Sequence, residues 1–481
     1  MSRAADVLVV GAGPAGSSLA ARLADAGAGV LLLDERTFPR SKPCGDCVSP
    51  GALPLLAELG VLEELDRRGA GRLEGWRIRT PAGRWFGGGF GSAADGTPIA
   101  GPALPRRDLD AALLEAAARA GARVREGTRV VDLLRSGGRI RGVLARDGVG
   151  REVPLRAGMV VGADGLRSTV ARRMGGVDLG PSARLALVAR FEDGPEPDGP
   201  PVGEMRVSDE GCLGMAPVGG GRWNVTVVVP RSMARAVATD REAFFGDRLA
   251  AYGVAGRLEG ARRAGPLQVT GPFEVAPHRV AAPGALLVGD AAGYFDPFTG
   301  QGIHGALAGA RIAAACALEA LGAGGVRAEE AALLRYEREL GGAIGPSRRV
   351  QRVVDHVLRR PRLLEPAARL LDAAPGLAEL LLRVTGDLEP AGALLHPVRL
   401  AAALTGAGRA TDHARGAAAR HDGRITEDIR EPERPEPGEV EGREAACTPT
   451  TRSSSGRRSE SAWGWRPTSR RGRPSSSTIA G

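Results

Sequence analysis

The chain has 481 residues, of which 43% are hydrophobic, so it can bury a large core and exceeds the usual size of one domain. Its formal net charge is +9, but 56 acidic residues offset the 65 basic ones, and Lys42 is the only lysine, a skew that indicates coding bias. No nucleic-acid-reading motif accompanies the charge, five cysteines are too few for a disulfide scaffold, and no stretch approaches the ~20 uninterrupted apolar residues of a membrane span. We therefore expect a cytoplasmic globular protein with no nucleic-acid partner and no integral membrane segment.

The first 34 residues predict a strand, a helix and a second strand. The run DVLVV is typical of a buried strand, and SSLAARLADAG carries apolar residues at helical spacing (Leu19, Leu23 and Ala26). The run GVLLLD then predicts another strand. Strand, helix and strand in so few residues form a βαβ crossover, whose two strands are parallel.

The turn between the first strand and the helix reads GAGPAG at residues 11–16, a G-x-G-x-x-G pattern. Gly11 allows the tight turn, Gly13 lets the backbone approach a pyrophosphate, and Gly16 allows close helix–strand packing. The helix amino terminus offers unpaired N–H groups to phosphates, and an acid after the second strand can hold the adenosine ribose. A purely structural glycine turn is disfavoured by this context. The residues expected to bind the dinucleotide here are Gly11, Gly13, Pro14, Ala15, Gly16, Asp34, Glu35 and Arg36.

Later segments alternate between helical and strand-like patterns. Residues 108–120 have helical periodicity, whereas residues 181–269 contain strand-like runs separated by Gly and Pro clusters, which favours a mainly antiparallel sheet. A buried strand and a glycine turn at 299–305 precede a long helix, and helical patterns continue to about residue 422.

Two further motifs follow GAGPAG in order: GADGLRS at residues 162–168 and GDAAGYFDPFTGQG at residues 289–302. Together the three motifs resemble the superfamily of FAD-dependent aromatic hydroxylases (group A monooxygenases) and geranylgeranyl reductases, over about residues 5–400. The resemblance implies an α/β fold with a Rossmann-like FAD-binding domain of the glutathione-reductase type. It also implies an inserted, mainly antiparallel substrate domain, a helical C-terminal region, and NAD(P)H as a reductant that visits transiently.

On this basis the chain divides into four parts. The FAD-binding domain is placed at 1–75, 100–180 and 270–325, the substrate domain at 76–99 and 181–269, the helical region at 326–423, and a disordered tail at 424–481. The tail prediction rests on composition, because residues 447–481 hold seven Arg against one Glu, with many Ser, Thr, Pro and Gly. Such a segment has too little apolar surface to offset its ordering entropy.

The resemblance assigns further cofactor contacts. Asp164 would lie near the pyrophosphate, Asp290 would accept hydrogen bonds from the ribityl hydroxyls, and Arg106, or Arg107 in the neighbouring register, would contact the FAD. The helix beginning near Ile303 would direct its positive end toward the flavin. The residues assigned in this way are Arg106, Asp164, Gly165, Gly289, Asp290, Pro297, Gly300, Gly302 and Ile303.

The stretch SKPCGDCVSP at residues 41–50 contains Cys44 and Cys47 in a C-x-x-C spacing. Zinc would need two more ligands at suitable spacing, and a thioredoxin-like dithiol would need its own βαβ unit, so no metal site is expected. Small buried spacers and a thiol relay to the flavin stay open as alternatives. In the resembling reductases a Cys-Gly loop lines the flavin and substrate side, which makes Cys44 and Gly45 candidate catalytic-site residues. His304, in the first turn of the last helix motif, is a third candidate, against a purely structural role.

Two reactions fit the resemblance. The KPCGD loop favours a reductase that delivers hydride to an alkene or prenyl substrate. Those reductases, however, carry an aromatic-x-aromatic-x-Phe-Pro pattern where residues 212–217 read CLGMAP. We therefore expect an FAD-dependent, NAD(P)H-driven monooxygenase that hydroxylates or epoxidises a hydrophobic small molecule, free or carrier-tethered, in specialised metabolism. The ene-reductase is the alternative, and a flavin-binding module without catalysis is disfavoured by the intact motifs.

Overall fold

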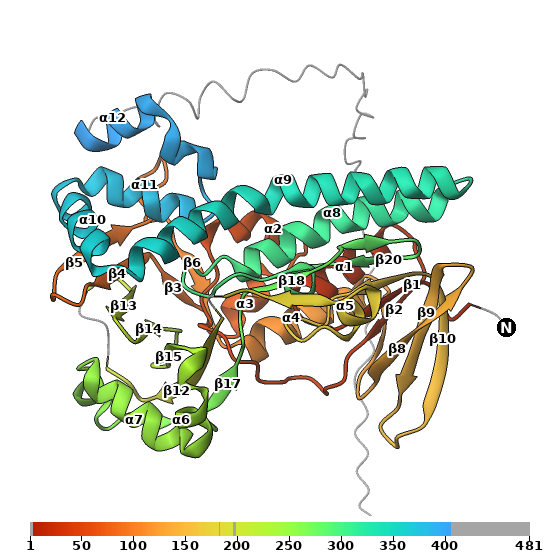
Figure 1. The fold of residues 1–481 in the computed structure, drawn as a ribbon, viewed down its shortest axis with the longest axis horizontal. Coiled ribbons are helices and arrows are strands. Elements are labelled where there is room, and N and C mark those ends of the chain that lie inside the picture. Colours follow the sequence, from red (N-terminus) through yellow and green to blue (C-terminus); the bar gives the residue numbers. More distant parts are fainter. Residues whose placement is uncertain (1–2, 182, 196–198, 406–481) are drawn as a thin grey trace, which may run out of the picture. The chain divides into compact units, whose positions relative to one another are not determined.

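The computed structural model describes residues 3–181, 183–195 and 199–405 (Figure 1). The chain forms a mixed α/β fold with two large sheets. The predicted disordered tail at 424–481 lies outside the described residues.

The first sheet contains the predicted βαβ unit, with strands β1 and β2 parallel and joined by helix α1. The strand order is β19-β20-β10-β1-β2-β7, and β8 and β9 extend the sheet from β10 as antiparallel neighbours. Pairing is parallel from β20 to β7, so the carboxyl ends of β1, β10 and β20 meet at one edge. The bounds are β1 Ala5–Val10, β2 Val30–Leu33, β7 Arg123–Arg125, β8 Arg129–Ser136, β9 Arg139–Arg146, β10 Glu152–Gly162, β19 Ala281–Ala282 and β20 Ala285–Leu287.

Four helices pack with this sheet: α1 (Pro14–Asp25), α4 (Arg106–Arg119), α8 (Gly302–Gly322) and α9 (Val326–Leu358). Helix α1 contacts both α4 and α8, and α8 contacts α9. Among the described residues, α8 alone is long and apolar enough to cross a membrane, but half of its most apolar window is buried inside the fold. Its place between α1 and α9 is that of a core helix, because a helix that is apolar all round buries that surface against neighbours.

The second sheet has the order β16-β12-β15-β14-β13-β4-β5, with β17 also paired to β12. Its pairs are antiparallel except β13 with β4, so the sheet is mainly antiparallel, as predicted. Strands β4 and β5 come from a segment more than 90 residues before the others. The bounds are β4 Gly75–Arg79, β5 Trp85–Gly89, β12 Arg184–Glu192, β13 Val202–Ser208, β14 Gly211–Pro217, β15 Trp223–Pro230, β16 Arg262–Arg263 and β17 Gln268–Thr270.

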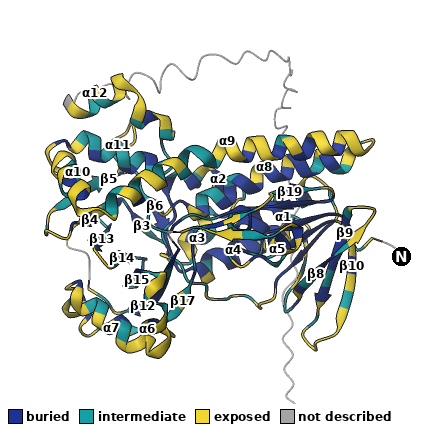
Figure 2. Ribbon diagram, in the orientation of Figure 1, coloured by how far each residue is buried: buried dark blue, intermediate teal, exposed yellow. Residues whose placement is uncertain are grey.

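The remaining elements are short or belong to the helical C-terminal segment. Helices α10 (Pro361–Ala373) and α11 (Pro375–Thr385) contact the edge strand β5, and α12 spans Pro397–Thr405. Figure 2 shows buried residues along the strands of the first sheet and exposed residues along the outer face of α9. The other bounds are α2 Leu53–Ala57, α3 Leu62–Arg67, β3 Gly71–Leu73, β6 Gly101–Ala103, α5 Thr169–Met174, β11 Val177–Leu179, α6 Ala234–Thr239, α7 Arg241–Ala251 and β18 Val275–Pro277.

Candidate active site

A cavity of about 200 Å³ lies between the two sheets. One wall consists of the loops that follow β1, β10 and β20, and the other consists of residues of β12, β14 and β15, most of them at alternate positions. Ligands of open α/β sheets bind outside the carboxyl ends of the parallel strands, and the first wall lies at these ends. The predicted site residues that line the cavity are Gly13, Pro14, Ala15, Cys44, Gly45, Arg106, Gly165, Gly289, Asp290, Pro297, Gly300, Gly302 and Ile303.

The three glycines of GAGPAG have different surroundings. Gly11 has φ +99°, and a Cβ there would lie 2.4 Å from the carbonyl oxygen of Ala163. A Cβ on Gly16 would lie 1.8 Å from the carbonyl oxygen of Gly11, so these two glycines close the turn. A Cβ on Gly13 would instead meet only guanidinium nitrogens of Arg40 and Arg106, at 3.8 and 3.9 Å. The open side of Gly13, two guanidinium groups and the amino terminus of α1 together fit a diphosphate.

The acid after β2 is held by backbone hydrogen bonds. Asp34 is buried, and its carboxylate accepts hydrogen bonds from the backbone N–H groups of Ala12 and Arg36, both at 2.8 Å. It therefore ties the glycine turn to the end of β2. Glu35 and Arg36 are exposed and lie 3.7 Å apart as an ion pair. None of these three side chains lines the cavity.

Burial distinguishes the two arginines at the start of α4. Arg106 is buried, lines the cavity, and donates to both carboxylate oxygens of Asp110 at 2.7 and 2.9 Å. Although burial acts in the opposite direction, the Asp110 carboxylate raises the pKa of Arg106 above its usual value. Arg107 points to solvent beside Asp108. Arg106 is therefore the cavity residue of the pair.

The loop after β10 places Gly165 in the cavity wall and turns Asp164 away from it. The Asp164 carboxylate accepts hydrogen bonds from the Ser168 hydroxyl at 2.5 Å and from the Thr169 N–H at 2.6 Å. Burial raises the pKa of Asp164, and these hydrogen bonds oppose the rise. In this arrangement Asp164 holds the amino terminus of the short helix α5.

The GDAAGYFDPFTGQG segment lies along the cavity between β20 and α8. Asp290 lines the cavity, and α8 begins at Gly302, so the positive end of the α8 dipole lies at this wall. Asp296 does not line this cavity but forms an ion pair with Arg184 of β12 at 2.7 Å. That pair joins the cofactor side to the second sheet.

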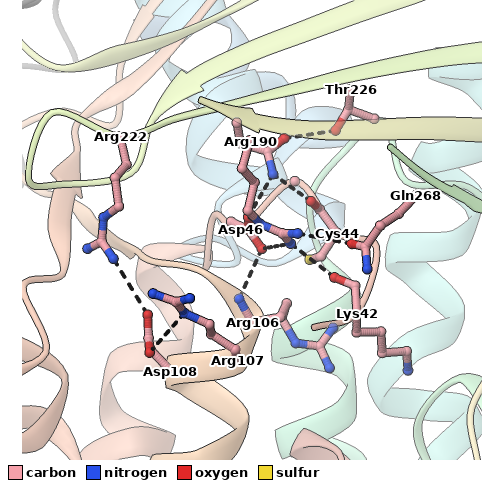
Figure 3. A network of polar contacts seen from close by, with 12 residues as sticks. Lys42, Cys44, Asp46, Arg106, Arg107, Asp108, Arg190, Arg222, Thr226 and Gln268 are labelled. Atoms are coloured by element: carbon pink, nitrogen blue, oxygen red, sulfur yellow. Dashed lines mark hydrogen bonds and ion pairs between the residues drawn. The ribbon is translucent and has the colours of Figure 1, made fainter. Parts of the chain in front are cut away.

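The Cys44 loop is held by Asp46, which the sequence had not marked (Figure 3). Asp46 is fully buried and has φ +58°. Its carboxylate accepts hydrogen bonds from Arg190 at 2.5 and 2.8 Å, from the Asn224 amide at 2.7 Å and from the Arg106 backbone N–H at 3.1 Å. Asn224 also donates to the carbonyl oxygen of Cys44 at 2.7 Å. The loop is thereby fixed to β12, β15 and α4.

Cys44 and Cys47 are both free thiols that line the cavity. Burial, and then the charge of Asp46, hold the pKa of Cys47 well above its usual value, and the Cys47 thiol lies 3.2 Å from the carbonyl oxygen of Gly45. The Arg106 guanidinium, which lines the same cavity, interacts electrostatically with Cys44. Within the described part of the chain, no group of three His, Cys, Asp or Glu side chains is arranged to hold a metal ion.

His304 faces a second cavity, of about 420 Å³, on the other side of the GDAAGYFDPFTGQG segment. Its Nδ1 lies 3.3 Å from the Asp387 carboxylate, which also accepts hydrogen bonds from Ser49 and Gln301 at 2.7 Å each. His304 therefore lies away from Cys44 and connects α8 to the segment that follows α11.

Comparison with known proteins agrees with this geometry. A family model described as "FAD binding domain" matches residues 4–341. A menaquinone reductase of Mycolicibacterium smegmatis is 32% identical over 411 residues, which cover 81% of this chain and 93% of that protein. A digeranylgeranylglycerophospholipid reductase of Methanothrix thermoacetophila is 31% identical over 358 residues, covering 71% and 84%.

Among solved structures, the FAD-dependent halogenase of chondrochloren biosynthesis superposes with a TM-score of 0.64 at 27% identity, covering 70% of this chain and 79% of that one. A geranylgeranyl bacteriochlorophyll reductase-like protein from Thermoplasma acidophilum superposes with a TM-score of 0.66 at 24% identity, covering 82% and 98%. At that identity the second likeness concerns the fold alone.

Proposed function

The chain belongs to the FAD-binding domain family, and we propose that it is a flavin-dependent reductase that hydrogenates a carbon–carbon double bond of an isoprenoid lipid. NAD(P)H is the proposed reductant. In this reaction one π bond is broken, two C–H bonds form, and NAD(P)H is oxidised. Bound FAD, once reduced by NAD(P)H, would supply the hydride, and the protein would supply orientation, a proton and exclusion of water.

The observation that carries this proposal is the position of Cys44. Its thiol lies in the cavity at the junction of the cofactor wall and the second sheet, and the buried Asp46 holds its loop in place. A thiol there can hold the proton that the second alkene carbon needs, and Arg106 beside it would stabilise the thiolate that remains. Reduction stands ahead of monooxygenation because the relatives at 31–32% identity are named as a menaquinone reductase and a digeranylgeranylglycerophospholipid reductase.

The cavity wall from the second sheet supports an apolar substrate. Strands β12 and β15 contribute Ala186, Val188 and Val228, and β13 contributes Met205. The cavity also contains Phe273 and Phe298. Apolar walls with a few placed polar groups are typical of sites for hydrophobic small molecules.

Monooxygenation stays the second candidate because of three small residues in β14. Cys212, Gly214 and Ala216 all line the cavity, at the positions where the resembling geranylgeranyl reductases carry aromatic side chains. Their small size leaves room for a substrate bulkier than a prenyl chain, free or carrier-tethered. Such a substrate suits oxygen transfer as well as reduction.

The product distinguishes the two reactions. Purified protein is incubated with NAD(P)H and an isoprenoid alkene such as menaquinone, under ¹⁸O-labelled oxygen, and the product is analysed by mass spectrometry. We expect a gain of two hydrogens within the isoprenoid side chain, located by fragmentation after reoxidation of the quinone ring, and no ¹⁸O. A product that contains one ¹⁸O atom would replace the reductase with a monooxygenase.

A further inference from the structure

Lys42 is the single lysine of a chain with 65 basic residues, all the others being arginine. Lysine and arginine differ in shape, since ammonium is a compact point charge and guanidinium is a planar fork. Lys42 is thus the one basic position of the sequence that carries a compact ammonium in place of a guanidinium. The surroundings of the Lys42 ammonium indicate which kind of group it binds.

The Lys42 loop is fixed, and its side chain enters the cavity. The backbone carbonyl of Lys42 accepts a hydrogen bond from Arg190 at 3.0 Å, within the network that holds Asp46. Figure 3 shows the side chains of Lys42 and Arg106 extending in the same direction, away from Asp46. Both side chains line the cavity, together with Gly13 at the amino terminus of α1.

The neighbouring cations form direct ion pairs with carboxylates, whereas the Lys42 ammonium interacts with Asp290 and Asp110 only at longer range. Arg106 is bound by both oxygens of Asp110, and Arg40 lies 3.0 Å from Asp110 and 3.6 Å from Asp34. Across residues 3–181, 183–195 and 199–405, the Lys42 ammonium has neither a hydrogen bond nor an ion pair. Burial, and then the charge of Arg106, lower the pKa of Lys42, so an anion brought into the cavity would stabilise the ammonium.

The space around the ammonium is limited by Gly165. This glycine has φ +76°, and a Cβ there would lie 3.2 Å from the Lys42 Nζ. The ammonium thus occupies the volume that the missing side chain leaves free. A guanidinium, which is larger and planar, would have to displace the backbone at Gly165 or turn away from the cavity.

We propose that the Lys42 ammonium binds a phosphate oxygen of FAD at the amino terminus of α1, and that arginine cannot replace it there. The phosphate completes a site made of the α1 backbone N–H groups, Arg106 and Lys42. This proposal depends on the proposed function only because both require bound FAD. A phosphate of NAD(P)H has the same chemistry, and the experiment separates the two sources.

The first test measures FAD affinity in three full-length variants. Lys42→Met removes the positive charge, and Lys42→Arg keeps the charge but places it on a planar guanidinium. Arg72→Met removes an exposed charge outside the cavity. Release of FAD on dilution of the holoprotein, followed by flavin fluorescence, gives the dissociation constant. We expect Lys42→Met to raise this constant about 10- to 100-fold, as for a lost charge-assisted hydrogen bond. We expect Lys42→Arg to raise it at least several-fold and Arg72→Met to leave it unchanged.

Wild-type affinity in Lys42→Met would overturn the proposal, and wild-type affinity in Lys42→Arg would overturn the need for an ammonium. If FAD affinity is unchanged while the NAD(P)H concentration for half-maximal flavin reduction rises, the phosphate belongs to NAD(P)H and the FAD assignment is wrong. Neither readout depends on the reaction product, so both can be interpreted even if the protein is not a reductase.

The second test needs no variant, because a single lysine makes amine labelling site-specific. Wild-type protein with and without FAD is treated with acetic anhydride, and the peptide containing Lys42 is quantified against the amino-terminal amine. We expect bound FAD to slow acetylation of Lys42 at least several-fold, whereas NADP⁺ added without FAD should not. Equal acetylation rates with and without FAD would overturn the proposal even if the variants fail to fold.

Discussion

The two walls of the cavity are built by different means. The cofactor wall consists largely of backbone: the turn at 11–16, the glycine loop after β10 and the segment at 289–302. The substrate wall consists of side chains of β12, β14 and β15, most of them at alternate positions. A backbone cradle needs particular residue types at fixed spacing, whereas a side-chain wall accepts many sequences. On the proposed function, the first wall would therefore bind the cofactor, and the second would select the substrate.

The largest effect is expected on the cofactor wall. Gly13→Glu should abolish FAD retention, because a carboxylate would pair with Arg40 and Arg106 and occupy the place of the diphosphate. The measurement is the flavin-to-protein absorbance ratio after gel filtration, with thermal unfolding to confirm a folded variant. A folded, yellow Gly13→Glu protein would refute the placement of the diphosphate at α1.

At the junction of the two walls, Cys44→Ser should reduce turnover about 10²- to 10⁴-fold, the usual range for a proton-transferring group. FAD retention should not change, because the Cys44 contact with Asn224 uses the backbone carbonyl. Cys316→Ala, in the core of α8 and outside the cavity, serves as the control for thiol removal. Full turnover in Cys44→Ser would remove the thiol from the reaction.

The link between the walls is tested by Asp46→Asn. Asparagine tolerates the positive φ of this position but leaves the Arg190 guanidinium without its carboxylate. Breaking a buried ion pair in this way should lower the free energy of unfolding by about 3–5 kcal/mol. Urea denaturation measures the change, and the double variant Asp46→Asn/Arg190→Met should recover part of it. An unchanged free energy of unfolding would mean that the network does not hold the loop.

A change on the substrate wall alone should leave the cofactor in place. At Gly214 a Cβ would meet its nearest neighbour at 4.0 Å, so Gly214→Trp can fill the cavity without a backbone clash. We expect KM for the substrate to rise about tenfold or more, as for loss of one apolar contact region. The spectrum of bound flavin should stay unchanged. If the variant loses FAD instead, the two walls are not separable as argued.

The smallest effect is expected from truncation after residue 423. The removed segment lies outside the described residues, and its composition predicts disorder. Turnover and FAD affinity of the truncated protein should equal those of the full chain. A loss of turnover would reveal a contribution of the tail to the site.

The sequence predicted the βαβ unit and the three motifs of the first wall because their signals are local. The βαβ unit, the glycine turn and the loops at 162–165 and 289–302 each depend on a short motif, and the fold brings them to one sheet edge. The role of Asp46 could not be predicted, because its partners Arg190 and Asn224 lie 144 and 178 residues away. The only signal was its place in the C-G-D loop.

His304 and Asp34 have side-chain contacts that their motifs did not predict. Each lies beside a cofactor motif, and the motif fixes the backbone but not the side-chain direction. His304 meets Asp387 from the segment after α11, and Asp34 meets the backbone of Ala12. Likewise, strand-like runs between Gly and Pro clusters predicted strands in the second sheet, but which residues face the cavity depends on long-range strand pairing.

The most direct test of the central claim is turnover in the absence of oxygen. The protein, NAD(P)H and an isoprenoid alkene are mixed anaerobically, and the saturated product is quantified against a Cys44→Ser control. The account predicts multiple turnovers with one NAD(P)H consumed for each double bond reduced. Turnover that requires oxygen, with none in its absence, would contradict it and assign the cavity to oxygen transfer.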